Sequence, residues 1–256
     1  MMNSIESRVK AQQQRLWLWM ISTALIIVVI AGYKFYTHGL PYLAEEIADT
    51  IPASVYTAVD ESTLESLDDS EFEPSQLNEA KQQELRTLFS SLLNKDSTSE
   101  RQFKLEFRSW GGKANAMALA DGTIVITDAM VNLASAQEEL SAVLLHELGH
   151  VEHNHVMESI VSSSIVFAGL TLILGDVSAL ADVILQGAVV GINQSYSRQA
   201  ELEADKYASD QLVALYGNAR AMQSVLTKLS EEYPNEMSWL STHPSFEDRI
   251  QQIESK

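Results

Sequence analysis

Five consecutive residues in the middle of the sequence, from His146 to His150 (HELGH), combine side chains that can hold a metal ion and activate water. Two histidines four positions apart lie on the same face of an α-helix, so both imidazoles can reach one ion. Zinc lowers the pKa of a water molecule to about 7, and the carboxylate of Glu147 is placed to take that proton. The pattern therefore predicts a hydrolytic zinc centre with His146 and His150 as metal ligands and Glu147 as general base.

The residues around this motif place it on a helix that buries one face. Residues 135–138 match a capping-box pattern, so we expect the helix to begin near residue 136 and to run to about residue 155. An apolar stripe would face the core while the histidines project from the other side, and it consists of Leu140, Leu144, Leu148 and Val151. Solvated surface histidines would show the same spacing and are the alternative. We expect His153 and His155, which follow the motif, on the surface.

A third metal ligand has to come from elsewhere, because a catalytic zinc ion usually takes three protein ligands and keeps one position open. A downstream carboxylate is the best candidate, since residues 197–205 show a helix start that contains Glu201, Glu203 and Asp205. Glu201 and Asp205 share one face of such a helix, whereas Glu203 lies about 200° away from Glu201. Spacing alone does not choose between Glu201 and Glu203 as the ligand.

Four blocks of the sequence resemble the HtpX/BepA-type zinc metallopeptidases, a gluzincin family that includes CAAX-prenyl proteases and mitochondrial inner-membrane quality-control proteases. The resemblance runs from about Pro74 to Ile253. The blocks are Asn115-Ala116 through Gly122-Thr123-Ile124-Val125-Ile126-Thr127, His146-Glu147-Leu148-Gly149-His150, Ser197-Arg198 with Glu201 and Ala204-Asp205, and Ser241-Thr242-His243-Pro244-Ser245 with Arg249-Ile250.

The resemblance implies a ligand set and a way of holding substrate. It implies one zinc ion per chain, with Glu201 as the third ligand and Asp205 as a catalytic residue that supports the site or donates a proton. The strand at Asn115 is similar to an edge strand that would pair with an extended polypeptide. His243 matches the family's His-Pro position. It would approach the metal or stabilise the oxyanion there, and the alternative is a histidine that only packs after a loop.

The helix with the motif must be held by a domain, which we expect to be α+β, mainly helical and, by the resemblance, zincin-like. Periodicity predicts a helix over 78–94 and a half-buried strand over 103–108. Residues 115–119 and 123–127 read as two more strands around a turn, and we expect a small antiparallel sheet. Helices follow, with breaks near Gly175, Gly217-Asn218 and Pro234, and residues 157–192 are expected to wall the active site.

An uncharged stretch from Leu16 to Tyr33 predicts one transmembrane helix, because it spans roughly 27 Å. Trp17, Trp19, Tyr33 and Tyr36 lie near its ends, where aromatic rings favour the membrane interface. Basic residues precede it, so the positive-inside rule predicts a cytoplasmic N-terminus; they are Arg8, Lys10 and Arg15. A cleaved signal peptide is the alternative, but no A-x-A-like site follows. With the resemblance, this predicts a single-pass protein of a bacterial inner membrane, in contact with lipid over residues 16–36, with a periplasmic catalytic domain.

The composition excludes several classes of function. The formal net charge is −18, and the acidic excess lies beyond residues 1–37, so we expect no nucleic-acid partner. The absence of cysteine excludes disulfides, cysteine nucleophiles and thiolate metal sites. The stretch 60–73 concentrates acidic residues and is expected to be exposed.

The predicted organisation is a cytoplasmic end and anchor at 1–37, an acidic juxtamembrane spacer at 38–74, and a zinc metallopeptidase domain at 75–256.

The predicted function is a membrane-anchored zinc endopeptidase that hydrolyses unfolded or misassembled proteins in protein quality control. Its partners would be polypeptide substrates. A membrane-tethered chaperone or assembly factor with a gated zinc site is the first alternative. A structural zinc domain closed by a fourth ligand such as His243 is the second. Glu147 argues against the structural site, because such a site needs no general base.

Overall fold

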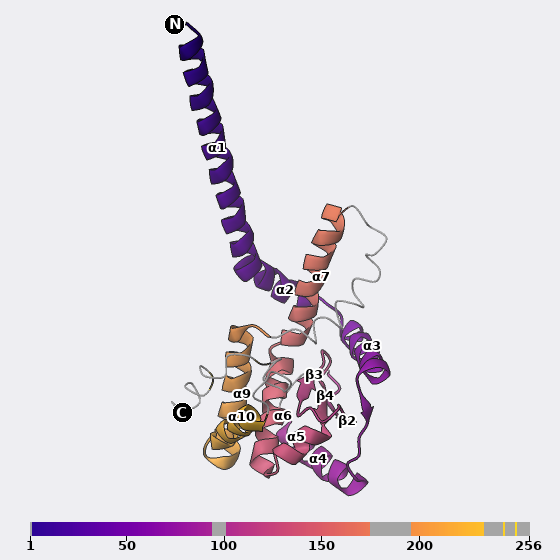
Figure 1. Cartoon of the computed structure of the whole chain (residues 1–256). Helices are drawn as coiled ribbons and strands as arrows, with labels where there is room; N and C mark the ends of the chain where they lie inside the picture. Colours follow the sequence, from indigo (N-terminus) through magenta and orange to yellow (C-terminus); the bar gives the residue numbers. More distant parts are fainter. Residues whose placement is uncertain (1, 94–100, 175–195, 233–242, 244–248, 250–256) are drawn as a thin grey trace. The chain divides into compact units, whose positions relative to one another are not determined.

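The computed structural model describes residues 2–93, 101–174, 196–232, 243 and 249, and its described part is predominantly helical with one small sheet (Figure 1). This confirms the α+β fold class. The chain divides into two compact units, Met1–Glu46 and Ile47–Lys256.

The first unit is a long helical run. Helix α1 (Met2–Lys34) continues through a π-helical turn, η1 (Phe35–Gly39), into α2 (Leu40–Ala48). By length and composition, the stretch Arg8–Ala48 is the one helix among the described residues that is long and apolar enough to cross a membrane, with a mean hydropathy of 2.1 in its most apolar window. The predicted span from Leu16 to Tyr33 lies inside it.

Helix α3 (Ala53–Ser70) corrects the expectation that the acidic stretch 60–73 is exposed throughout. The helix buries one face, which comprises Tyr56, Asp60, Thr63 and Leu67. Leu67 and Phe72 pack with Leu119 and Val125 in a small hydrophobic cluster. The other six acidic residues of 60–73 are exposed as expected: Glu61, Glu65, Asp68, Asp69, Glu71 and Glu73. The dense acidic composition therefore concealed an amphipathic helix that belongs to the second unit.

The described sheet has four strands in the order β1-β2-β4-β3. Their bounds are Glu73–Pro74, Lys104–Ser109, Ala116–Ala118 and Thr123–Thr127 for β1 to β4. The pairs β1–β2 and β3–β4 are antiparallel, but β2 and β4 are parallel, so the sheet is mixed and the expected antiparallel sheet was wrong on this point. Alternating apolar residues predict which face of a strand is buried, and they carry no information about the direction of its neighbour.

Helices α4 (Glu79–Leu92) and α5 (Asp128–Leu133) pack into the same core as the sheet. Asn78 caps α4 by accepting a hydrogen bond from the backbone N–H of Lys81 at 2.9 Å. Leu85, Phe89 and Leu92 are buried on the face that periodicity indicated. The predicted helix over 78–94 is confirmed with slightly shorter bounds.

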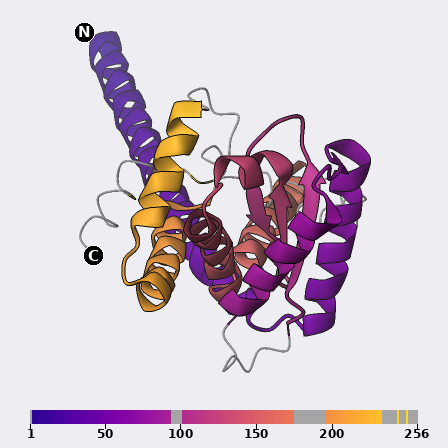
Figure 2. The same ribbon diagram turned by 90° about the horizontal axis from the view of Figure 1, so that it is seen from below.

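Helix α6 (Gln137–Glu152) is the central element, and every residue from Glu139 to Val151 is buried. Its N-cap is Ala136 rather than Ser135, and the Glu139 carboxylate accepts a hydrogen bond from the Ala136 N–H at 3.3 Å. The helix lies between the strands and the pair α9–α10 (Figure 2). The face opposite the predicted apolar stripe is thus buried as well.

Helix α9 (Arg198–Tyr216) packs along α6 and is followed by α10 (Arg220–Glu232). Ser197 caps the start of α9, and Gly217, at φ +78°, ends it in the left-handed conformation that the predicted break requires. Helices α6 and α9 approach closely where Gly149 of α6 faces Ala204 of α9, since a Cβ atom on Gly149 would lie 2.9 Å from the Ala204 Cα. The absence of a side chain at Gly149 permits this crossing.

Helix α7 (His155–Leu174) follows α6 after a short turn. It covers the first part of the region 157–192 that was expected to wall the active site. Residues 175–195, with the expected break at Gly175, lie outside the described residues, as does the expected break at Pro234.

Candidate metal centre

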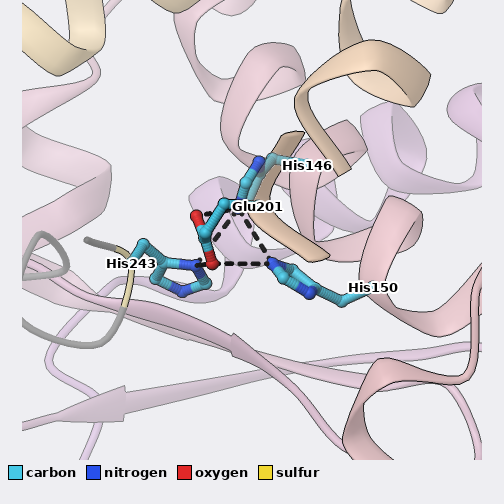
Figure 3. Close-up of side chains that lie close together, drawn as sticks. All are labelled: His146, His150, Glu201 and His243. Atoms are coloured by element: carbon cyan, nitrogen blue, oxygen red, sulfur yellow. Dashed lines mark hydrogen bonds and ion pairs between the residues drawn. The ribbon is translucent and has the colours of Figure 1, made fainter. Parts of the chain in front are cut away.

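Four buried side chains converge beside the crossing of α6 and α9. They are His146 and His150 from α6, Glu201 from the first turn of α9, and His243. Each offers one nitrogen or oxygen atom, and these atoms all lie within 4.8 Å of one another. The side chains point toward a common centre (Figure 3). The helical period places His146 and His150 there, and the close approach at Gly149 brings Glu201 to them.

The distances between the donor atoms suit a metal ion. The Nε2 atoms of His146 and His150 are 3.0 Å apart, and they lie 3.6 Å and 3.5 Å from the two carboxylate oxygens of Glu201. Ligands at about 2.0–2.2 Å from a tetrahedral ion are separated by roughly 3.3–3.6 Å. Because imidazole nitrogens and a carboxylate at this spacing match that geometry, the residues present fit a metal ion with nitrogen and oxygen ligands.

The charge states of these donors also suit a cation. Burial, together with the imidazoles of His146 and His243, lowers the pKa of His150 well below its ordinary value. The ring is therefore neutral, as a metal ligand has to be. Burial alone would raise the pKa of Glu201, but His243, Arg249 and His146 lower it below its usual value. Glu201 is thus a buried carboxylate that keeps its negative charge.

His243 lies within the donor set, which the sequence left open. Its Nδ1 atom is 3.2 Å from His146 Nε2 and 3.0 Å from Glu201 Oε1. Its Nε2 atom is 3.6 Å from an oxygen of Glu147. The reading of His243 as a side chain that only packs after a loop does not account for these contacts.

Glu147, the expected general base, is fully buried next to the donor set. One oxygen of its carboxylate, Oε2, accepts a hydrogen bond from the backbone N–H of Ala118 in β3 at 2.9 Å. The sheet therefore fixes the position of this carboxylate. Because β3 is an edge strand of the described sheet, Glu147 joins the metal centre to a strand edge.

Asp205 lies behind His146 and is paired with Arg249. Its Oδ1 atom is 2.9 Å from His146 Nδ1, and Arg249 donates two hydrogen bonds to the carboxylate, at 2.7 Å and 2.8 Å. Burial alone would raise the pKa of Asp205, but Arg249 and His146 hold it well below its usual range. Arg249 Nη1 also lies 2.9 Å from Glu201 Oε2. The two side chains form an ion pair there, but the angles are not those of a hydrogen bond.

Comparison with known proteins identifies the family. Residues 79–256, more than half of the chain, match the model of peptidase family M48. The chain belongs to peptidase family M48. It is therefore a metallopeptidase, and the cluster of His146, His150, Glu201 and His243 is where this M48 protein could hold its metal.

Three relatives have names that state a peptidase activity. The chain is 32% identical to the mitochondrial metalloendopeptidase OMA1 of Arabidopsis thaliana over 137 residues, which is 53% of this chain and 28% of the relative. It is 28% identical to the beta-barrel assembly-enhancing protease of Escherichia coli, covering 53% and 31%. It is 26% identical to the metalloprotease LoiP of Escherichia coli, covering 56% and 58%. The match thus spans between about a quarter and three fifths of these relatives.

His155 corrects one expectation in this M48 protein, because it is buried rather than on the surface. Its Nδ1 atom lies 3.0 Å from His150 Nδ1, and its Nε2 atom lies 3.1 Å from Glu203 Oε2. The structure thus places Glu203 outside the donor set and beside His155, whereas it places Glu201 inside. His153 is exposed, as expected. The chain turns after α6, which helix spacing could not indicate.

Two other residues at the site carried no sequence signal of their own. The ring of Tyr196 stacks on His150, with centroids 4.0 Å apart and an angle of 21° between the planes. Burial, with Glu147 and Glu201 nearby, raises the pKa of Tyr196 well above its ordinary value, so its hydroxyl stays protonated. Arg249 appeared only as part of the resemblance.

Proposed function

We propose that this M48 protein is a membrane-anchored, zinc-dependent endopeptidase that hydrolyses unfolded or misassembled proteins. One observation carries the proposal: Glu147 lies beside a group of two imidazoles and a carboxylate with the spacing of zinc ligands. Histidine nitrogen and carboxylate oxygen are ligands that zinc accepts in catalytic sites, in which a histidine pair with one glutamate recurs. His146, His150 and Glu201 would hold the ion.

Glu147 would be the group that moves protons. A zinc ion in this position would polarise the peptide carbonyl and lower the pKa of the attacking water. Glu147 would take a proton from that water and pass it to the leaving amine. The hydrogen bond from Ala118 N–H fixes one oxygen of this carboxylate, Oε2, beside the donor set.

Asp205 and Arg249 would fix the position of His146. The Asp205 carboxylate accepts the Nδ1 proton of His146, so that Nε2 is the nitrogen directed to the ligand cluster. Arg249 in turn holds Asp205 by two hydrogen bonds. This arrangement makes the metal-facing nitrogen more basic and restricts rotation of the ring.

The edge of β3 supports an extended polypeptide as the substrate. Residues 115 and 119 bond to β4 through Thr127 N–H to Asn115 O and Leu119 N–H to Thr123 O. The backbone groups of the alternate residues 116 and 118 therefore face away from β4, and of these the Ala118 N–H already donates to Glu147. Pairing along such an edge uses main-chain hydrogen bonds and needs an unfolded segment. The name of the beta-barrel assembly-enhancing protease supports a role in protein quality control.

We place the protein in a bacterial inner membrane with its N-terminus in the cytoplasm and its catalytic domain in the periplasm. The support is the apolar helix within Arg8–Ala48. Basic residues at positions 8, 10 and 15 lie on the N-terminal side of its apolar part. Substrates would then be proteins at or near the periplasmic face of that membrane.

The substitution Glu147→Gln tests this function. In the full-length protein purified in detergent, we expect one zinc ion per chain in both forms, because the carboxamide does not remove a ligand. Degradation of unfolded casein should fall by roughly 10²- to 10⁴-fold in the variant, since the general base is lost. Zinc is measured by metal analysis and degradation by the release of acid-soluble peptides.

Glu138→Gln is the matched control, because it removes one exposed carboxylate from the same helix. Its casein activity should equal that of the unchanged protein. Zinc absent from the unchanged protein, or degradation that survives Glu147→Gln, would contradict the proposed mechanism.

The second candidate function is a membrane-tethered chaperone or assembly factor with a gated zinc site. The observation that favours it is the burial of His146, Glu147, His150 and Glu201 together with a fourth donor, His243, among them. Rescue of a deletion strain by Glu147→Gln would favour this function, because a chaperone needs no general base.

A further inference from the structure

The Nδ1 atom of His150, on the side of the ring away from the donor set, is held by side chains that have no role in the proposed mechanism. We propose that His155 and Glu203 are positioning residues that fix the orientation and tautomer of His150 for metal binding. The inference rests on the proposed metal site. It assigns a role to two residues outside the ligand cluster and outside the Asp205–Arg249 pair.

The contacts permit one consistent placement of protons. The Nε2 atom of His150 faces the cluster, 3.0 Å from His146 Nε2 and 3.5 Å from Glu201 Oε1, so the proton of a neutral His150 ring lies on Nδ1. That N–H points to His155 Nδ1 at 3.0 Å, which must then accept. The proton of His155 consequently lies on Nε2 and is donated to Glu203 Oε2 at 3.1 Å. These protons are assigned from the network of contacts.

Glu203 is itself held in place at the end of this chain of hydrogen bonds. Gln199, one turn earlier on α9, donates from its side-chain amide to Glu203 Oε1 at 2.6 Å. The carboxylate therefore has one oxygen for Gln199 and the other for His155. Negative charge at this end favours the direction of donation from His150 through His155 to Glu203.

The backbone after α6 is shaped to bring His155 to His150. Helix α6 ends at Glu152, and Asn154 adopts φ +59°, a left-handed conformation that asparagine tolerates better than most residues. Arg101 holds this turn by donating to Val151 O and to Asn154 Oδ1. A continued helix would carry residue 155 away from residue 150, whereas this turn places it on the Nδ1 side of the ring.

The two imidazole ligands thus have corresponding supports. His146 contacts the carboxylate of Asp205 directly, at 2.9 Å, and His150 reaches the carboxylate of Glu203 through His155. Both carboxylates belong to α9, the helix that also carries Glu201. Carboxylate partners of a ligating histidine fix its ring and its tautomer, and their loss typically weakens metal binding by about 10- to 100-fold.

Zinc affinity of the full-length protein in detergent tests the inference. We expect His155→Ala and Glu203→Ala to raise the zinc dissociation constant, measured by competition with a chelator, by about 10- to 100-fold. His155→Gln and Glu203→Gln should recover part of that loss, because a carboxamide oxygen can still accept a hydrogen bond. Asp210→Asn, which changes an exposed residue of the same helix α9, is the control and should leave the constant unchanged.

A purely structural role would give a different result. It would lower the melting midpoint of the metal-free variants while the zinc dissociation constant of the folded protein stayed at the control value, and this outcome would overturn the proposal. Glu203→Ala keeps the test open if His155→Ala does not fold, because the Glu203 side chain is 39% exposed. Failure of the unchanged protein to bind zinc would instead contradict the proposed metal site.

Discussion

At the scale of single residues, Asp60 is an acid in an unusual setting. It accepts hydrogen bonds from the backbone N–H groups of Asp121 at 2.9 Å and Thr123 at 3.4 Å, in the turn between β3 and β4. Burial raises its pKa to about 6, although these N–H donors favour the charged form. The folded state therefore binds this proton more tightly than the unfolded state does. The protein should lose stability as the pH rises from about 4 through 6.

Asp60→Asn should remove this pH dependence. A pKa raised by about two units corresponds to about 3 kcal/mol, so the unfolding free energy of the unchanged protein should fall by up to that amount, relative to the variant, between pH 4 and pH 7. Chemical unfolding followed by circular dichroism in detergent at several pH values measures the difference. Glu61→Gln, at an exposed neighbour, is the control. Parallel curves for the unchanged protein and Asp60→Asn would contradict the assignment.

The sequence predicted which residues lie together at the candidate site where one helix relates them, and it missed contacts between distant segments. His146, Glu147 and His150 follow from helical spacing, and Glu201 came from the resemblance. The contact between Arg249 and Asp205 joins residues 44 positions apart, and that between Glu203 and His155 joins residues 48 apart. No local period connects such pairs, because Arg249 and His155 reach α9 from segments that are distant in the sequence. His155 was misplaced since the turn at Asn154 breaks the period.

At the scale of elements, the crossing of α6 and α9 determines the geometry of the site. Gly149→Ala adds a Cβ atom 2.9 Å from the Ala204 Cα and 3.0 Å from its carbonyl oxygen, so the helices must separate. We expect a loss of about 1–3 kcal/mol in the unfolding free energy, although alanine favours helices more than glycine does. Zinc affinity should fall as well, because Glu201 moves with α9.

Gly169→Ala is the matched control for this prediction. Gly169 lies in α7, and a Cβ atom there would meet nothing within 4 Å. Its substitution should be neutral or slightly stabilising through helix propensity alone. The unfolding free energies and zinc dissociation constants of the two variants should therefore differ. Equal values would contradict the prediction that the close contact between α6 and α9 determines the geometry of the metal centre.

Element positions were easier to predict than their pairing. The strand at Lys104–Ser109 was found from the alternation of its residues, and Leu105 and Phe107 are buried as that alternation requires. Its parallel pairing with β4 was not found, because the intervening β3 takes the edge and no residue pattern encodes this order. Helix α3 was missed since acidic residues dominate its composition and two of its four buried residues, Asp60 and Thr63, are polar.

At the scale of the whole molecule, the predicted orientation can be tested by protease protection. We expect proteinase K added to spheroplasts of an expressing bacterium to degrade the domain at 75–256, because the basic residues before the apolar helix should keep the N-terminus inside. The same domain should be protected in inverted membrane vesicles. Immunoblotting against a C-terminal tag follows both reactions.

A cytoplasmic marker protein, which must be protected in intact spheroplasts, is the control for this experiment. Protection of the domain in spheroplasts would contradict the predicted orientation. Recovery of the domain in the soluble fraction without residues 1–37 would favour the signal-peptide alternative.

The pairing of Asp205 with Arg249 has a consequence for the order in which a ribosome delivers the chain. The apolar N-terminal helix is made first, the ligands on α6 and α9 follow, and Arg249 comes 44 residues after Asp205. Leaving one partner of a buried ion pair alone costs about 3–5 kcal/mol, so the α9 carboxylates should stay hydrated until this arginine is synthesised. On the proposed anchoring, a nascent chain would therefore reach the membrane before its metal centre is complete and able to hydrolyse any protein, its own unfinished neighbours included.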